Sequence, residues 1–141
     1  MSVQLEIISP EKLLLRKDVQ MAVIPGAEGD IAAMPGHAPI MMMLRGGLVS
    51  LYEGGQIVEQ YFISGGFADM TAERCTVLAD EVKMLSEISI ENARTRLAGL
   101  ESSFANVAAE DISTQDTIAR HIQAVRAEIE AAELLLNATR H

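Results

Sequence analysis

Glycine and proline are confined almost entirely to the first part of this chain, and their distribution constrains the fold more than any other sequence feature. Nine of the ten glycines and all four prolines lie before residue 86. They separate short stretches that are mostly apolar, for example residues 48–52 and 75–79, or that alternate apolar with polar residues, as in residues 3–7. Short stretches rich in β-branched and aliphatic residues, each ended by turn residues, are typical of a sandwich or barrel built from many strands. Residues 1–86 are therefore predicted to form an all-β domain.

Some details of this domain can be predicted as well. One strand is expected over residues 13–24, which are largely apolar. Hairpin turns are expected at three glycine pairs, Gly46-Gly47, Gly54-Gly55 and Gly65-Gly66. Residues 25–39 hold three of the four prolines and read as a loop. This loop is either two consecutive turns or a shaped surface that presents Glu28, Asp30 and His37 to a partner, and the residues alone leave both open.

After residue 86 the apolar period changes from that of strands to that of helices. Apolar residues recur every three or four positions, at Ile90, Ala93, Leu97, Leu100, Phe104 and Val107, and again at Ile118, Ile122, Val125, Ile129, Ala132 and Leu136. Ser89 is expected to cap the first helix, and Ser113 or Thr114 the second. Because the connection over about residues 108–113 is short, the helices are predicted to lie antiparallel with their seams facing.

The chain is thus predicted to consist of a β-sandwich domain, residues 1–86, and a helical hairpin domain, residues 87–141. Two ion pairs are expected along the second helix, Asp116 with Arg120 and Arg126 with Glu130. Each would contribute only about 0.2–0.5 kcal/mol, so the apolar seam must supply most of the stability. That seam is thinned by the small residues Ala93, Gly99 and Ala132. We expect a marginal hairpin that can open or detach.

The charge balance limits the partners of the chain. With 20 acidic residues against 11 basic ones, nucleic acid and anionic membrane surfaces would be repelled, so neither is expected to bind. The single cysteine, Cys75, points to a reducing compartment. The N-terminus lacks the basic segment and apolar run of a secretory signal. The longest apolar stretch, residues 38–44, is far shorter than the roughly 20 residues that span a bilayer, so membrane association is expected to be indirect.

No group of residues predicts catalysis. His37, His121 and His141 are scattered, and no grouping of cysteine, histidine and acidic residues has metal-ligand spacing. Cys75 lies inside a predicted strand and is expected to be a small buried hydrophobe rather than a nucleophile. The glycines lack the lysine that ends a phosphate-binding loop. We predict no catalytic residue, no metal ligand and no cofactor.

Five motifs along the β domain, taken in order, resemble one known family. They are Ile8-Ser9-Pro10-Glu11, Pro25-Gly26-Ala27-Glu28-Gly29-Asp30, Pro35-Gly36-His37-Ala38-Pro39, Gly65-Gly66-Phe67 and Val77-Leu78-Ala79-Asp80. Their order and intervals resemble the epsilon subunit of bacterial F-type ATP synthases, which is homologous to the mitochondrial delta subunit. Each motif alone is weak, but the combination is highly specific. The two-helix tail matches too, so the resemblance covers the whole chain.

The resemblance implies a β-sandwich of about ten strands followed by an antiparallel two-helix hairpin. It implies a non-catalytic central-stalk subunit that links the gamma subunit to the membrane c-ring and couples proton transport to ATP synthesis. Such a subunit is peripheral, at the cytoplasmic face of the bacterial inner membrane, and its hairpin reaches the beta subunit in some members. By motif, the segment facing the ring loops matches Glu28, Gly29 and Asp30, and the turn near gamma matches His37, Ala38 and Pro39.

The tail departs from the family's pattern in two respects. Members that bind ATP have Ile, Asp, two variable residues, Arg and Ala at the start of the first helix, where this chain reads Ile88-Ser89-Ile90-Glu91-Asn92-Ala93. Without the Asp acceptor and the Arg donor, we predict no tight ATP binding. Residues 114–141 carry three arginines against four acidic residues, which gives little attraction to an acidic segment of beta. Inhibition of ATP hydrolysis by the hairpin is predicted to be weak.

Three other interpretations stay open. A regulatory nucleotide sensor is disfavoured by the altered motif at the start of the first helix. An independent carbohydrate-binding sandwich or a small enzyme would be expected to show surface aromatics or a set of metal ligands, and the chain has no Trp and two Tyr. The mitochondrial counterpart is disfavoured by the absence of a transit peptide, although a processed chain would look the same.

Overall fold

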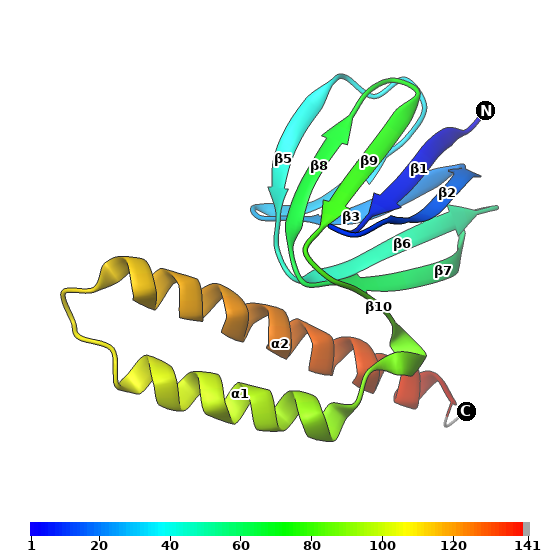
Figure 1. The fold of residues 1–141 in the computed structure, drawn as a ribbon. Helices are drawn as coiled ribbons and strands as arrows, with labels where there is room; N and C mark the ends of the chain where they lie inside the picture. The colour runs from blue at the N-terminus through cyan, green and yellow to red at the C-terminus, as the bar shows by residue number, and fades with distance from the viewer. Residues whose placement is uncertain (140–141) are drawn as a thin grey trace.

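The computed structural model of the protein describes residues 1–139, so Arg140 and His141 lie outside the described residues. The strands are β1 (Val3–Ile8), β2 (Leu13–Val19), β3 (Met21–Gly26), β4 (Gly29–Ala33), β5 (Ile40–Leu44), β6 (Gly47–Glu53), β7 (Gln56–Ile63), β8 (Gly66–Met70), β9 (Arg74–Ala79) and β10 (Val82–Met84). A 3-10 turn, η1 (Leu85–Glu87), leads to α1 (Ile90–Ala105) and α2 (Ile112–Thr139). The strands form a curled sheet, and α2 lies between this sheet and α1 (Figure 1).

All ten strands belong to one sheet that curls into two facing layers. Along the sheet the order is β10-β7-β6-β3-β5-β8-β9-β1-β2, with β4 paired to β3 beside this path. The two layers meet where Gly26 of β3 pairs with Leu44 of β5. The pairs are antiparallel except that β1 runs parallel to β9. This arrangement confirms the predicted all-β domain of about ten strands followed by a helical hairpin.

The core forms because alternate side chains of each strand point into the space between the layers. In β9, Cys75, Val77 and Ala79 are buried, whereas the residues between them are more exposed. The two layers of the curled sheet are joined near its ends by Lys17 of β2, the last strand, whose Nζ donates a hydrogen bond of 2.5 Å to Glu59 of β7, the strand next to β10. That hydrogen bond holds the pKa of Glu59 below its ordinary value. The pair helps to close the sandwich.

Two of the expectations about strands and turns are wrong. The strand expected over residues 13–24 is two strands, β2 and β3, separated at the exposed Gln20. Of the glycine pairs, only Gly54-Gly55 closes a hairpin, with φ values of 59° and 76° between β6 and β7. Gly46-Gly47 and Gly65-Gly66 instead lie where the chain passes from one layer to the other, between strands that do not pair. Glycine is favoured both in hairpin turns and where the chain crosses between layers, so a glycine pair in the sequence does not distinguish the two.

Residues 25–39 are more ordered than a loop of two turns. Pro25 is buried within β3, and residues 29–33 form β4, which pairs back onto β3 through a tight turn at Gly26 and Gly29. A second turn, residues 34–39, follows β4 and leads into β5. The segment is therefore a β-hairpin followed by one turn.

The start of each helix is fixed by a side-chain cap. As predicted, Ser89 caps α1, because its hydroxyl accepts a hydrogen bond of 3.2 Å from the Asn92 amide. The prediction for α2 is wrong: the cap is Asp111, two or three residues earlier than expected, and its carboxylate accepts a bond of 3.1 Å from the Thr114 amide. Hydrogen bonds from Thr114 lower the pKa of Asp111. A carboxylate suits this place because the N-terminal amides of a helix lack intrahelical partners.

The seam between the helices is shorter than expected. Its buried members are Ala93, Val125 and Ile129, with Ile90, Leu97 and Leu100 packed against them. Phe104 and Leu136 are 41% and 48% exposed, and Val107 lies beyond the end of α1. Neither ion pair expected along α2 occurs within residues 1–139. Arg126 instead reaches Glu101 of α1 at 3.6 Å, because the facing helix brings a carboxylate to it.

Candidate functional site

A row of apolar side chains crosses the outer surface of the sandwich. It consists of one residue from each of five neighbouring strands, in register: Met43, Phe67, Leu78, Ile8 and Leu13. Met43, Phe67, Leu78 and Leu13 are 53%, 50%, 49% and 44% exposed. Adjacent strands are about 4.8 Å apart, so this outer apolar row is roughly 19 Å long. A continuous apolar strip of this kind is the expected centre of a protein–protein contact.

Charged residues flank the outer apolar row on the same surface. The carboxylate of Glu6 on β1 is almost buried, and its two oxygens lie 3.0 Å from Arg16 of β2 and 3.5 Å from Arg74 of β9. On β5, Met41 is 74% exposed and adds apolar area beside Met43, on the same face of that strand. The surface therefore has an apolar strip with a paired, polar border, as docking surfaces commonly have.

The predicted ring-facing residues lie together at the tip of the β3–β4 hairpin. Glu28, Gly29 and Asp30 are all exposed, and Gly29 has a φ of 141°. Asp30 accepts a hydrogen bond of 2.6 Å from the Arg45 guanidinium, which also donates to the Gly26 carbonyl at 2.5 Å. The turn is thus held by Arg45, while Glu28 has no ion pair in the described part of the chain.

The predicted gamma-facing residues occupy a different place. His37, Ala38 and Pro39 precede β5, and the ring-facing turn lies near the other end of that strand, where Gly26 pairs with Leu44. Five residues of strand correspond to about 17 Å, so the two predicted sites do not form one cluster. His37 is half-buried, and its Nδ1 donates to the Ala38 carbonyl at 2.6 Å. This bond fixes the imidazole against its own turn.

The hairpin is attached to the sandwich by a contact that sequence reasoning missed. The amide side chain of Gln123 on α2 binds both polar groups of Gly46, accepting from its N–H at 2.9 Å and donating to its carbonyl at 2.7 Å. A Cβ at Gly46 would lie 2.6 Å from the Ala124 Cα, so only glycine allows this approach. The sequence offered only a glycine pair that was predicted to form a hairpin turn, and the partner of Gly46 lies 77 residues away in the sequence.

A buried charge cluster joins the same parts of the chain. One oxygen of Glu128, on α2, accepts hydrogen bonds from Lys83 of β10 at 3.1 Å and from Arg96 of α1 at 2.6 Å. The Glu128 side chain is only 3% exposed, whereas those of Lys83 and Arg96 are 26% and 45% exposed. Lys83 also lies 3.1 Å from Glu81. The carboxylate therefore bridges the sandwich, α1 and α2.

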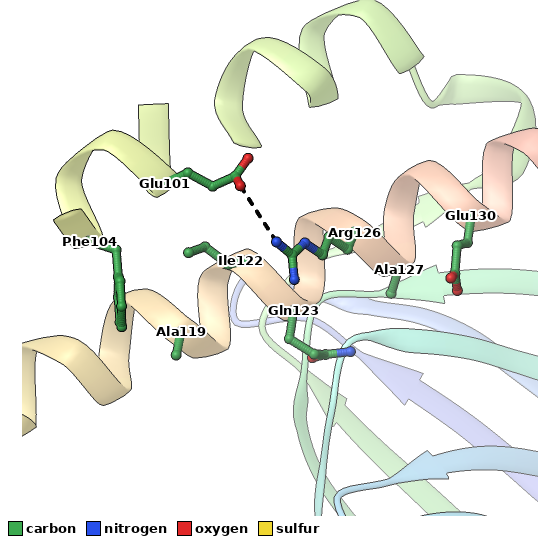
Figure 2. A pocket seen from close by; sticks show the side chains of 8 residues that line it. All are labelled: Glu101, Phe104, Ala119, Ile122, Gln123, Arg126, Ala127 and Glu130. Atoms are coloured by element: carbon green, nitrogen blue, oxygen red, sulfur yellow. Dashed lines mark ion pairs between the residues drawn. The ribbon is translucent and has the colours of Figure 1, made fainter. Parts of the chain in front are cut away.

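A shallow groove runs along the two helices near the hairpin tip (Figure 2). On one side Arg126 points to Glu101 of α1, and on the other Gln123, Ala127 and Glu130 point toward the strands of the sandwich (Figure 2). Phe104 adds an aromatic wall. The groove is lined by both acidic and basic side chains and is open to solvent, so it does not by itself specify a ligand.

Among the residues that the structure describes, the remaining chemistry-bearing groups do not assemble into a reactive centre. Cys75 is fully buried in β9, as predicted, and burial raises its pKa to about 12. Within residues 1–139, no three histidine, cysteine or acidic side chains come close enough together to hold a metal ion. Neither helix of that region has both the length and the apolar character needed to cross a membrane.

An outward apolar row, an anchored charged turn and a hairpin held against one side define a docking module. The family model described as "ATP synthase, Delta/Epsilon chain, beta-sandwich domain" matches residues 2–85. Over most of its length the chain is also similar to curated relatives called ATP synthase epsilon chain. The relative from Gluconacetobacter diazotrophicus is 50% identical over 132 residues, 94% of each chain, and that from Granulibacter bethesdensis is 49% identical over 128 residues, 91% of this chain and 95% of the relative. The chain belongs to the ATP synthase epsilon family, as the resemblance predicted.

Solved structures share the fold. A chain of the Euglena gracilis mitochondrial ATP synthase (OSCP/F1/c-ring, rotational state 1) superposes with a TM-score of 0.72 at 22% identity, covering 99% of this chain and 82% of that one. A chain of the Tetrahymena thermophila mitochondrial ATP synthase (central stalk/c-ring) gives a TM-score of 0.62 at 12% identity, covering 94% and 97%. At these identities the likeness concerns the arrangement of sandwich and helices.

Proposed function

We propose that the chain is a non-catalytic rotor subunit that links the gamma subunit to the membrane ring of an F-type ATP synthase. In this role it couples proton transport to ATP synthesis from the cytoplasmic face of a bacterial inner membrane. The observation that carries the proposal is the outer apolar row, a docking surface in a chain half identical to an ATP synthase epsilon chain. A chain from a central stalk and c-ring assembly has the same fold.

The outer apolar row is the proposed contact with gamma. Its side chains are half exposed, so covering them removes apolar area from water and favours association. The row includes Met43 of β5, and the exposed Met41, two residues earlier on the same face of that strand, extends the apolar area toward the predicted gamma-facing turn, His37, Ala38 and Pro39, which leads into β5. We therefore include this turn at the edge of the gamma contact. The polar border around the row fits the rim of such an interface.

The tip of the β3–β4 hairpin is the proposed contact with the ring. Glu28 is exposed and has no ion pair within residues 1–139, so it is available to a basic group of a ring loop. Asp30 is already paired with Arg45, and a ring contact there requires an exchange of partners. Exposed charge pairs contribute more to orientation and association rate than to affinity. We propose that Glu28, Gly29 and Asp30 orient the sandwich on the ring.

The helical hairpin, residues 87–141, is proposed as an accessory domain to the docking domain, residues 1–86. Nucleotide binding and inhibition of hydrolysis are both proposed to be weak. The motif at the start of α1 is altered. In addition, both arginines of α1 form ion pairs within the chain, Arg94 with Glu133 at 3.4 Å and Arg96 with Glu128 at 2.6 Å. Phosphate groups would have to displace these carboxylates.

Co-purification tests the proposal. Tagged full-length chain and tagged residues 1–86 are each expressed with the rest of the enzyme, and gamma and ring subunits are then sought by mass spectrometry. Both baits are expected to retain gamma and the ring. Absence of gamma from the full-length bait would overturn the proposed function. Loss of gamma with the truncated bait alone would overturn the assignment of docking to residues 1–86.

A further inference from the structure

Two neighbouring residues connect the β3–β4 turn to the hairpin. The guanidinium of Arg45 holds the turn, through Asp30 at 2.6 Å and the Gly26 carbonyl at 2.5 Å. The next residue, Gly46, is bound on both its N–H and its carbonyl by Gln123 of α2. A shift of Arg45 therefore acts on a peptide segment that α2 contacts directly.

A second carboxylate lies in the groove between the sandwich and α2 that Arg45 also lines. Asp30, Arg45 and Glu130 all line the groove between the sandwich and α2. Gln123, Ala127 and Glu130 recur at helical spacing and lie on the side of α2 that faces the strands (Figure 2). Glu130 makes no ion pair in the described part of the chain, since Arg126 pairs with Glu101 instead. Arg45 thus has one carboxylate in use and another across the groove.

We propose that Arg45 is a two-position switch that couples the β3–β4 turn to the docking of the hairpin. In one position it pairs with Asp30 and holds the turn. When a basic group of a partner takes Asp30, Arg45 pairs with Glu130 instead and holds α2 against the sandwich. The identity of that partner as a ring loop rests on the proposed function; the competition between Asp30 and Glu130 rests on the groove alone.

The coupling has a defined direction. Engagement of Asp30 by a basic loop favours the docked hairpin, because the released guanidinium strengthens the contact with α2. By linkage, a docked hairpin that draws Arg45 to Glu130 leaves Asp30 free for the loop, and the two effects are equal in free energy. Asp30, Arg45 and Glu130 line one groove and all three are near solvent, so the exchange leaves no buried charge unpaired.

Hydrogen exchange of the Gly46 amide measures docking, because this amide is covered by Gln123 only while α2 is in place. In the isolated full-length chain, Asp30→Asn releases Arg45 without a partner protein. We expect its Gly46 protection factor to rise about two- to five-fold, the size of one exposed ion pair. The double variant Asp30→Asn with Glu130→Gln is expected to return to the wild-type value. Glu28→Gln, in the same turn but without an ion pair, is the matched control and is expected to change nothing.

The Val77 amide in the core reports whether a variant alters the sandwich itself. An unchanged or lower Gly46 protection factor in Asp30→Asn, with Val77 unchanged, would overturn the switch. So would a rise that persists in the double variant. These outcomes are independent of the ring: loss of ring co-purification would remove the partner while leaving the exchange between Asp30 and Glu130 standing.

Discussion

The carboxylate of Glu128 on α2 lies 3.1 Å from the ammonium of Lys83 at the end of the sandwich, and only 3% of the Glu128 side chain is exposed. A carboxylate this buried requires charged or hydrogen-bonding partners. The ion pair therefore links the sandwich to the hairpin, and removing it is expected to weaken the contact between them.

Glu128→Ala is expected to weaken docking of the hairpin by about 1–3 kcal/mol, because hydrogen bonds to a buried charged group are lost. The loss is not expected to exceed this range, since Lys83 keeps Glu81 as a partner and both basic groups reach solvent. Hydrogen exchange of the Gly46 amide measures the change. Glu133→Ala is the control on the same helix, since its pair with Arg94 is exposed and contributes less than about 1 kcal/mol. Equal effects of the two substitutions would contradict this role of Glu128.

Alanine at two glycines is expected to have opposite effects. Gly46→Ala places a Cβ 2.6 Å from the backbone of Ala124, so α2 must shift, at a cost of about 1–3 kcal/mol. Gly99→Ala lies in the interior of α1, where the new Cβ meets no atom within 4 Å apart from its chain neighbours and the backbone of its own helix, and it is expected to stabilise the helix by about 0.5–1 kcal/mol. Hydrogen exchange of the α1 and α2 amides compares the two variants. Destabilisation by Gly99→Ala, or tolerance of Gly46→Ala, would show that the packing of α2 is described incorrectly.

Cys75 is expected to resist thiol reagents in the folded protein. Burial raises its pKa to about 12, so at pH 8 hardly any thiolate is present, and the strand must open before reagent reaches it. Labelling with a chromogenic disulfide at pH 8 should be slow in buffer and complete within the mixing period in concentrated denaturant. Rapid stoichiometric labelling of the native protein would contradict the burial of β9.

Nucleotide binding is expected to be undetectable at micromolar concentrations. The helix-start motif lacks an acidic residue and an arginine at the family's positions, and Arg96 is bound to Glu128. Isothermal titration of the full-length chain with MgATP tests this directly, and a micromolar dissociation constant would refute it. Removing residues 87–141 from the assembled enzyme is expected to change ATP hydrolysis less than about two-fold, under 0.5 kcal/mol. A large rise would show that the hairpin inhibits.

The sequence predicts the β-sandwich and the helical hairpin well because apolar residues recur with a different period in strands and in helices. Alternation in β9 and the three-to-four spacing around Ala93 and Val125 depend only on near neighbours in the chain. The Ser89 cap is local for the same reason. Local signals of this kind were sufficient for the class of each domain, and the motif order was sufficient for the family.

Contacts between distant residues account for what the sequence did not predict. Gly46 contacts Gln123 of α2, which lies 77 residues later in the chain. The buried Glu128 pairs with Lys83, 45 residues earlier. Neither pairing has a periodic signature. The cap at Asp111 was displaced because several neighbouring residues can cap a helix, and only the geometry of the turn selects one.

The central claim, that the outer apolar row binds gamma, is tested most directly by charging Phe67, which lies between Met43 and Leu78 in the row. Phe67 and Val58 are exposed to nearly the same extent, 50% and 48%, but only Phe67 belongs to the row. With purified gamma-containing F1, Phe67→Lys is expected to weaken binding of the full-length chain at least about 30-fold, the size of a hot-spot loss, and Val58→Lys less than about two-fold. Equal affinities for Phe67→Lys and the unaltered chain would contradict the account.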